Sequence, residues 1–162
     1  MNIDKKQLIK RNFDYYSELE FARKLAETGQ EAFFPFKDKG VDIIGIDDQG
    51  KAYFYQLKAR NLNFRKGVWG FKIDTKKLDK FPITDNSFWI FCALKVEEPK
   101  FDFFKIPVAK LKEIYYERKK TCGQREGHFI DIRKNKKNQS KWEFVSPSRL
   151  NELCDINTFL MK

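Results

Sequence analysis

The sequence is poor in the residues that usually build histidine or cysteine sites. It contains one histidine, His128, and three cysteines, Cys92, Cys122 and Cys154, without a CxxC pair. A single histidine excludes a histidine-based metal cluster, a catalytic triad and a two-histidine nuclease site within one chain, and the scattered cysteines indicate no zinc site. Cys92 lies in the apolar run FWIFCAL, which predicts a buried small hydrophobic residue.

Several common sequence signals are also absent. The chain has no GxxxxGK phosphate loop, no GxGxxG fingerprint and no internal repeat, which argues against ATP-driven and dinucleotide chemistry. It has no signal peptide and no apolar segment approaching the length of a membrane span. We therefore expect a cytoplasmic protein without a membrane partner.

Aromatic side chains and positive charge are abundant. The 162 residues include 17 Phe, 6 Tyr and 3 Trp, which predicts a single domain with a Phe-rich core. The formal net charge of +10 favours a polyanionic partner such as nucleic acid. Many basic domains bind no specific partner, so charge alone does not assign one.

Residues 40–58, GVDIIGIDDQGKAYFYQLK, predict two β-strands joined by a tight turn at residues 47–50. The turn contains Asp and Gly, which tolerate the left-handed backbone that a short hairpin needs. Three polar residues stand out: Asp42 in the first strand, and Gln56 and Lys58 in the second. Because strand side chains alternate, Gln56 and Lys58 share one face of their strand.

These polar residues suit metal-dependent hydrolysis of a phosphodiester. Carboxylate and amide oxygens are ligands for Mg²⁺, which takes few protein ligands and keeps most of its waters. A lysine beside them can hold the attacking water and offset the charge that develops on the phosphate. The structural alternative places Asp42 in a turn before the strand, with Gln56 and Lys58 facing solvent at a sheet edge.

A helix is predicted upstream of this hairpin. Ser17 and Glu20 match a capping box at its start, and Gly29 is a stop signal at its end. Glu18, in the first turn, can bring a second carboxylate to the metal, and Glu20 is its rival for that role. An apolar stripe at helical spacing is expected to face the sheet and consists of Leu19, Ala22, Leu25 and Ala26.

The remaining patterns predict one α/β domain with a mixed sheet of about four or five strands. Further strands are expected at residues 32–36 (an edge strand because of Pro35), 67–73 (a third strand of the same sheet), 87–94 (central) and 102–106. A helix is expected from Pro107 to about residue 120, followed by a hairpin of residues 127–132 and 142–145 and a last helix capped by Ser146. Residues 74–81 are too short and charged to assign. The core of the domain is expected at about residues 15–120, with a C-terminal extension at about 121–162.

Two basic segments are candidate phosphate contacts. The first follows Lys58 and offers Arg60, Arg65 and Lys66. The second, residues 133–141, holds five cations and no acid, and is expected to be mobile until it orders on a phosphate backbone. Its candidate DNA contacts are Arg133, Lys134, Lys136 and Lys137. Both segments can equally be solvated surface loops.

The motifs SELEFARKLAETG, FFPF, GVD, YFYQLKAR and GVWGF follow one another closely across about residues 17–94. In this order they resemble the PD-(D/E)XK nuclease superfamily, and most of all its branch of group I intron-associated homing endonucleases and small Holliday-junction-resolvase-like proteins. The resemblance implies a restriction-endonuclease-like fold, which is a mixed central β-sheet flanked by helices. It also implies a metal site at Glu18, Asp42, Gln56 and Lys58, in which Gln56 replaces the commoner glutamate and removes one negative charge.

The implied activity is that of a Mg²⁺-dependent endodeoxyribonuclease, with Mn²⁺ able to substitute. Asp42 is then the principal metal ligand, Gln56 and the Leu57 carbonyl add oxygens, Glu18 binds directly or through water, and Lys58 positions the attacking water. One site cuts one strand, so double-strand cleavage requires a homodimer or homotetramer. Two alternatives stay open: a catalytically inactive DNA-binding module of the same fold, which the glutamine favours, and a restriction or defence component that acts only with partner chains.

Overall fold

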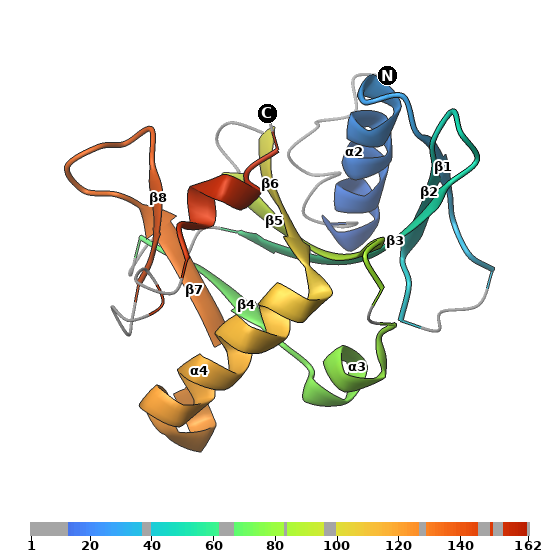
Figure 1. Ribbon diagram of the computed structural model, residues 1–162. Helices are drawn as coiled ribbons and strands as arrows, with labels where there is room; N and C mark the ends of the chain where they lie inside the picture. The colour runs from blue at the N-terminus through green and yellow to red at the C-terminus, as the bar shows by residue number, and fades with distance from the viewer. Residues whose placement is uncertain are drawn as a thin grey trace.

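The protein folds into two β-sheets with helices packed around them (Figure 1). The computed structural model describes residues 13–36, 40–61, 67–82, 84–95, 100–126, 129–145, 150 and 154–161, without the side chains of residues 95 and 122–126. In chain order the elements are α2 (Phe13–Glu27), β1 (Glu31–Phe33), β2 (Ile43–Ile46), β3 (Ala52–Asn61), β4 (Trp69–Lys72), α3 (Thr75–Lys80), β5 (Ser87–Lys95), β6 (Lys100–Pro107), α4 (Val108–Glu126), β7 (Phe129–Lys134), β8 (Trp142–Phe144) and the 3₁₀ helix η1 (Ile156–Phe159). The predicted α/β class is therefore confirmed.

The larger sheet has five strands in the order β1-β2-β3-β5-β6. The pairs β1–β2, β2–β3 and β5–β6 are antiparallel, and β3–β5 is parallel, so the sheet is mixed as predicted. Strand β1 lies at one edge, which confirms the position that Pro35 indicated. Strand β5 lies inside the sheet, as its apolar sequence predicted.

The larger sheet separates two hydrophobic cores, and β5 contributes to both. Ile90, Cys92 and Leu94 pack in the core beneath α2, while Trp89, Phe91 and Ala93 pack in the other core against β4, β7, β8 and α4. The alternation of consecutive β5 residues between two cores follows from the two-residue period of a strand. It explains why the sequence of β5 is apolar on both faces.

The smaller sheet corrects one prediction. Residues 67–73 were expected to add a third strand to the main sheet, but β4 pairs instead with β7 in a three-stranded sheet of order β4-β7-β8. The indole of Trp69 on β4 donates to the carbonyl oxygen of Leu94 on β5 at 2.9 Å, which holds the two sheets together. The predicted C-terminal hairpin is confirmed as β7 and β8.

Helix α2 begins earlier than the sequence indicated. Phe13 is its first residue, so Ser17 lies inside the helix and donates to the carbonyl oxygen of Asp14 at 2.6 Å instead of capping the N-terminus. The capping-box prediction is therefore wrong, because helical spacing extends one turn further toward the N-terminus. The stop signal is confirmed: Gly29 has a φ of 81°, a left-handed conformation that glycine adopts without strain just past a helix end.

The buried stripe of α2 is also different from the predicted one. Phe21, Leu25 and Ser17 are buried. Leu19 is 42% exposed and Ala26 is exposed, so these two members of the predicted stripe face solvent. Phe21 packs against the rings of Tyr55 and Phe103, whose size decides which face of the helix turns inward.

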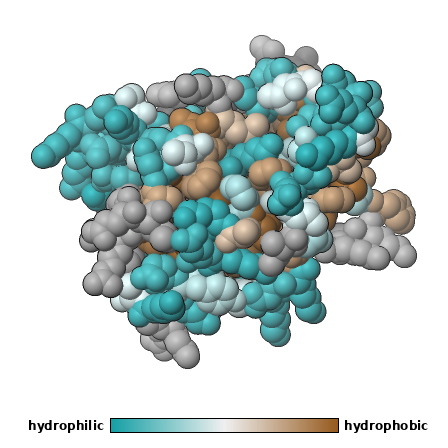
Figure 2. Space-filling view, viewed as in Figure 1, coloured by the Kyte–Doolittle hydropathy of each residue, from teal (hydrophilic) through white to brown (hydrophobic). Residues whose placement is uncertain are grey.

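Helix α4 extends to Glu126, beyond the expected end near residue 120. In the part of the chain that the structure describes, no helix is both long enough and apolar enough to cross a membrane. Two exposed aromatic side chains follow the edge strand, where Phe34 is 47% and Phe36 is 100% exposed. Figure 2 shows brown atoms at the right-hand rim of the molecule, where Figure 1 places β1.

Cys92 is buried, as predicted. The terminal residues Phe159, Leu160 and Met161 pack partly buried against the cores. The side chain of Cys122, the single histidine His128 and the predicted helix cap Ser146 lie outside the described residues.

Candidate metal and nucleic-acid site

The site begins where β2 and β3 separate. Their pairing ends at Ile43 and Tyr55, whereas β3 continues to Asn61. At the other end of the hairpin, Gly50 has a φ of 76° and Asp47 accepts the backbone N–H groups of Gln49 and Lys51, which confirms the predicted turn. The first half of β3 is therefore fixed by β2, and its second half presents one edge to other partners.

Asp42 lies just before the first residue of β2, and not inside the strand as predicted, at the point where β2 and β3 separate. Its backbone N–H donates to the carbonyl oxygen of Tyr55 at 2.8 Å, and its carboxylate oxygen Oδ2 accepts the backbone N–H of Leu57 at 2.7 Å. The carboxylate thus accepts the N–H of Leu57, which has no partner on β2 because the β2–β3 pairing has already ended. This pairing fixes Asp42 beside the second half of β3.

Gln56 lies next to Asp42 and is 1% exposed. Its amide nitrogen donates to Asp42 Oδ2 and also lies 3.3 Å from the carbonyl oxygen of Leu57. A carboxylate oxygen and a carbonyl oxygen therefore converge on one point. The amide oxygen of Gln56 is buried and accepts no hydrogen bond from any described residue. Since the nitrogen and oxygen of an amide exchange places by a half-turn, Gln56 can direct a third oxygen to that point.

A pocket of about 290 Å³ lies over these residues. We call it the carboxylate pocket. Helix α2 contributes Glu18, as predicted, together with Asp14, one turn earlier. The lining residues are Asp14, Ser17, Glu18, Asp42, Gln56, Leu57, Lys58, Ala59, Arg60 and Lys77. The structure therefore brings all four predicted metal-site residues to one pocket, while Glu20, the rival of Glu18, pairs with Arg23 on the helix surface at 3.2 Å.

The electrostatics of Cys92 agree with this arrangement. Burial raises the pKa of the Cys92 thiol well above its usual value, and the negative charges of Asp42, Glu18 and Asp14 raise it further. Cys92 sits beside Ala59 across the β3–β5 pair and packs in the core beneath α2, the helix that carries Asp14 and Glu18. The pocket thus gathers negative charge at the end nearest α2.

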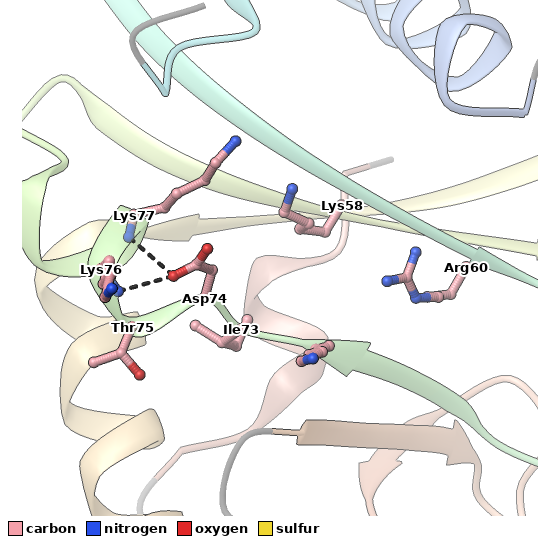
Figure 3. A pocket seen from close by; sticks show the side chains of 8 residues that line it. Lys58, Arg60, Ile73, Asp74, Thr75, Lys76 and Lys77 are labelled. Carbon is pink, nitrogen blue, oxygen red and sulfur yellow. Dashed lines mark hydrogen bonds between the residues drawn. The ribbon is translucent and has the colours of Figure 1, made fainter.

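A second pocket, of about 680 Å³, adjoins the first. We call it the basic pocket. Lys58, Arg60 and Lys77 line both pockets. Lys72 and Lys76 line the basic pocket alone, together with Ile73, Asp74 and Thr75. Figure 3 shows Lys58 and Arg60 on β3 across the pocket from Lys76 and Lys77 on α3. Cations from three elements therefore face a common space.

The second predicted basic segment lies elsewhere. Figure 1 places the turn between β7 and β8 on the opposite side of the molecule from α2 and β2. This segment was expected to be an unstructured linker, but Arg133 and Lys134 belong to β7, and the turn is closed by a hydrogen bond from the N–H of Asn135 to Lys141 O at 2.8 Å. Arg133, Lys134, Lys136 and Lys137 are not near the carboxylate pocket. Arg65 and Lys66 lie outside the described residues.

Sequence reasoning did not single out Asp14 in the carboxylate pocket, or Lys72, Lys76 and Lys77 in the basic pocket. Asp14 stands four positions before Glu18, a spacing that places both on one helix face once the helix starts at Phe13. Asp74 caps α3 by accepting the N–H groups of Lys76 and Lys77, and this cap is the signal that could have found the short helix.

Comparison of the chain with protein-family models, with curated proteins and with solved structures finds no match. Among the described residues, no three His, Cys, Asp or Glu side chains gather closely enough to hold a metal ion. The oxygens that converge at Asp42 are of mixed kinds, namely a carboxylate, an amide and a backbone carbonyl. A cation there would rely on neutral oxygens as much as on charge.

Proposed function

We propose that the chain is a Mg²⁺-dependent endodeoxyribonuclease with a restriction-endonuclease-like fold, similar to the PD-(D/E)XK superfamily. The observation that carries the proposal is the convergence of Asp42 Oδ2 and the Leu57 carbonyl on the Gln56 amide, in a pocket that also holds Glu18 and Lys58. An aspartate at a strand start, a glutamine and lysine two residues apart on the next strand, and a glutamate on a packed helix are the elements of that resemblance. The mixed sheet with α2 against it is consistent with the fold.

The residues present fit a divalent cation. The buried, unpartnered oxygen of Gln56 is an acceptor that a cation would satisfy, and Asp42 supplies the negative charge. Asp42, Gln56 and the Leu57 carbonyl would hold Mg²⁺ or Mn²⁺, with Glu18 bound directly or through water. The ion would supply Lewis-acid polarisation of the phosphate and a more acidic bound water.

The chain's own residues have separate roles in hydrolysis. Lys58 shares the pocket with Asp42 and positions the water whose oxygen attacks the phosphorus atom. The bond from phosphorus to the leaving sugar oxygen breaks, the attacking water loses a proton to solvent, and the leaving oxygen takes up a proton from solvent. The ammonium groups of Lys58 and Lys77 offset the charge that develops on the phosphate. Arg60 holds the same phosphate from the next outward position on β3. Contacts of DNA with Arg65, Lys66, Arg133, Lys134, Lys136 and Lys137 stay predictions.

Cleavage of supercoiled plasmid and of a four-way junction tests the proposal. With Mg²⁺ or Mn²⁺ we expect the wild type to cut and a chelator to stop it. Asp42→Asn should lower the rate by about a thousandfold or more, since a ligand worth several kcal/mol is lost. Lys58→Ala should lower it by about 10²–10⁴-fold, the range for a residue that assists proton transfer or orients water.

Lys51→Ala is the matched control, because Lys51 is an exposed lysine near the start of the same strand. Circular dichroism should show that the variants keep their fold. Metal-dependent cutting that survives in Asp42→Asn would refute the site at Asp42, and a wild type that cuts neither substrate with either metal would refute the nuclease proposal. Sedimentation of the active species would show whether the homodimer or homotetramer needed for double-strand cleavage forms.

A second candidate is a DNA-binding module without catalysis. It is favoured by one observation: Asp42 already serves β3 by accepting the N–H of Leu57, a role that needs no metal. This candidate predicts salt-sensitive DNA binding by wild type and Asp42→Asn alike, without cleavage of any substrate under either metal. A restriction or defence component that needs partner chains would also leave the isolated chain inactive, and would cut only when those chains are added.

A further inference from the structure

We infer that the basic pocket holds the phosphate next to the cleaved one, through Lys72 on β4 and Lys76 on α3. The inference rests on the proposed function and names a part of the substrate that this function leaves open. The two pockets share Lys58, Arg60 and Lys77, so a chain of phosphates can pass from one to the other without a break. A phosphate cleaved at Asp42 contacts the shared cations, and its neighbour on the same strand reaches Lys72 and Lys76.

Charge in the basic pocket is strongly one-sided. Of the described residues that line it, Lys58, Arg60, Lys72, Lys76 and Lys77 are cations and Asp74 is the single acid. Asp74 is engaged by its own helix, because Oδ1 accepts the backbone N–H groups of Lys76 at 2.9 Å and Lys77 at 3.3 Å. Its carboxylate thereby stiffens the turn that carries the two lysines. With one acid against five cations, the described lining keeps a net positive charge.

The position of α3 is fixed by contacts with α4. Thr75 and Tyr115 of α4 share a hydrogen bond of 2.7 Å, and the hydroxyl of Tyr116 donates to Asp79 at 2.8 Å. Leu78 on the inner side of α3 is fully buried. Lys76 and Lys77 are therefore presented by an anchored helix and not by a free surface loop. Figure 3 shows the two hydrogen bonds that Asp74 accepts at the start of this helix.

The shape and size also fit a strand of nucleic acid. A volume of about 680 Å³ is that of a pocket for a drug-sized ligand, and so matches a short stretch of backbone more than a whole duplex. Contacts from lysine to phosphate carry no sequence information, so this pocket sets the position and direction of the strand.

The test measures DNA binding in a chelator, so that it does not depend on cleavage. We would titrate a short DNA duplex, and an RNA duplex of the same sequence, into wild type and the Lys72→Ala/Lys76→Ala variant over a range of salt. Both lysines are exposed, so the fold should survive. For each lost phosphate contact the slope of log Kd against log salt should fall by about 0.9, hence by about 1.8 for the double variant on DNA.

Lys51→Ala again serves as the control, since Lys51 lies seven residues before Lys58, about 23 Å along an extended strand. The inference is overturned if the double variant keeps the wild-type slope. It is also overturned if Lys51→Ala lowers the slope by as much per removed charge as the double variant does. Tighter binding of the RNA duplex would replace DNA as the ligand and also overturn it. A reduced slope in a chain that never cuts DNA supports the pocket and refutes the nuclease. DNA cutting by the wild type, together with an unchanged salt slope in the double variant, supports the nuclease and refutes the role of the basic pocket.

Discussion

Basic side chains gather in two regions of the molecule, the basic pocket and the turn between β7 and β8. In the β7–β8 hairpin two of the cations, Arg133 and Lys134, meet acids on other strands. Arg133 lies 2.7 Å from Glu143, and Lys134 lies 3.6 Å from Asp102 and 4.0 Å from the centre of the Trp142 ring. In the basic pocket the one acid binds backbone N–H groups instead.

The difference shows that local charge density does not decide what a basic segment does. Residues 133–141 contain no acid, yet Glu143 and Asp102 arrive through strand pairing and packing. The lysines of the basic pocket come from three separate elements and line one cavity. The first arrangement joins strands within a hairpin and its neighbour, and the second gathers positive charge around a cavity.

The largest effect should come from adding a carboxylate to the carboxylate pocket, which shares Lys58, Arg60 and Lys77 with the basic pocket. Gln56→Glu places an acid beside Asp42 at a position that is 1% exposed. Without metal we expect a loss of about 1–3 kcal/mol from a buried like charge, or roughly 2–4 °C in Tm for each kcal/mol. Saturating Mg²⁺ should raise the Tm of this variant more than that of the wild type, because the ion gains a second charged ligand.

The pH dependence of Gln56→Glu has a definite sign. Burial and the charge of Asp42 raise the pKa of the new carboxyl in the folded state above its unfolded value, near 4.3. In a chelator the loss of stability relative to wild type is therefore absent below about pH 4.3 and grows as the pH rises to the folded pKa. Calorimetry at several pH values measures it. Equal Mg²⁺ stabilisation of both proteins would speak against a cation at Asp42.

Much of the carboxylate pocket was readable from the sequence. The hairpin and its turn at residues 47–50 follow from strand patterns and turn residues, and alternation puts Gln56 and Lys58 on one face. Glu18 and Asp42 were singled out by residue type and by the resemblance, and the structure brings all four residues to one pocket. What could not be read is the path of the chain after β3. Local patterns identify β4 as a strand, but whether it joins the first sheet or the second depends on the packing of Trp69 and Phe71 against distant residues.

The helices show the same division between local and distant causes. Gly29 ends α2 through its own backbone conformation, so its role was predictable. The inward face of α2 was not, because Phe21 is selected over Leu19 by the rings of Tyr55 and Phe103. Helix α3 was missed because a six-residue segment offers too little periodicity, and its ties to Tyr115 and Tyr116 lie far along the chain.

A smaller effect is expected from the second region in DNA binding. Lys136→Ala/Lys137→Ala removes two exposed lysines of the β7–β8 turn, a change of charge equal to that of the Lys72/Lys76 variant. With a short duplex in a chelator, we expect the salt slope to stay near the wild-type value, since a Debye length of about 10 Å screens charges on the opposite side. Fluorescence anisotropy measures it. A slope reduced by about 1.8 would instead make the turn a DNA contact, as the sequence first indicated.

The smallest expected change tests why the β7–β8 turn should contribute little to DNA binding. Glu143 accepts from Arg133 at 2.7 Å and from the amide of Asn135 at 2.6 Å, and both charged side chains are partly exposed. Glu143→Gln keeps the size of the side chain and removes its charge, so the hairpin should lose no more than about 1 kcal/mol. Because Arg133 is then less neutralised, affinity for a long DNA duplex at low salt should rise slightly, while Arg60 and the basic pocket are untouched.

Lys72→Ala/Lys76→Ala combined with Glu143→Gln should show the two effects adding independently, since the sites share no partner. Unchanged affinity in Glu143→Gln would mean that distance from the path of the DNA, and not pairing with an acid, keeps Arg133 from binding.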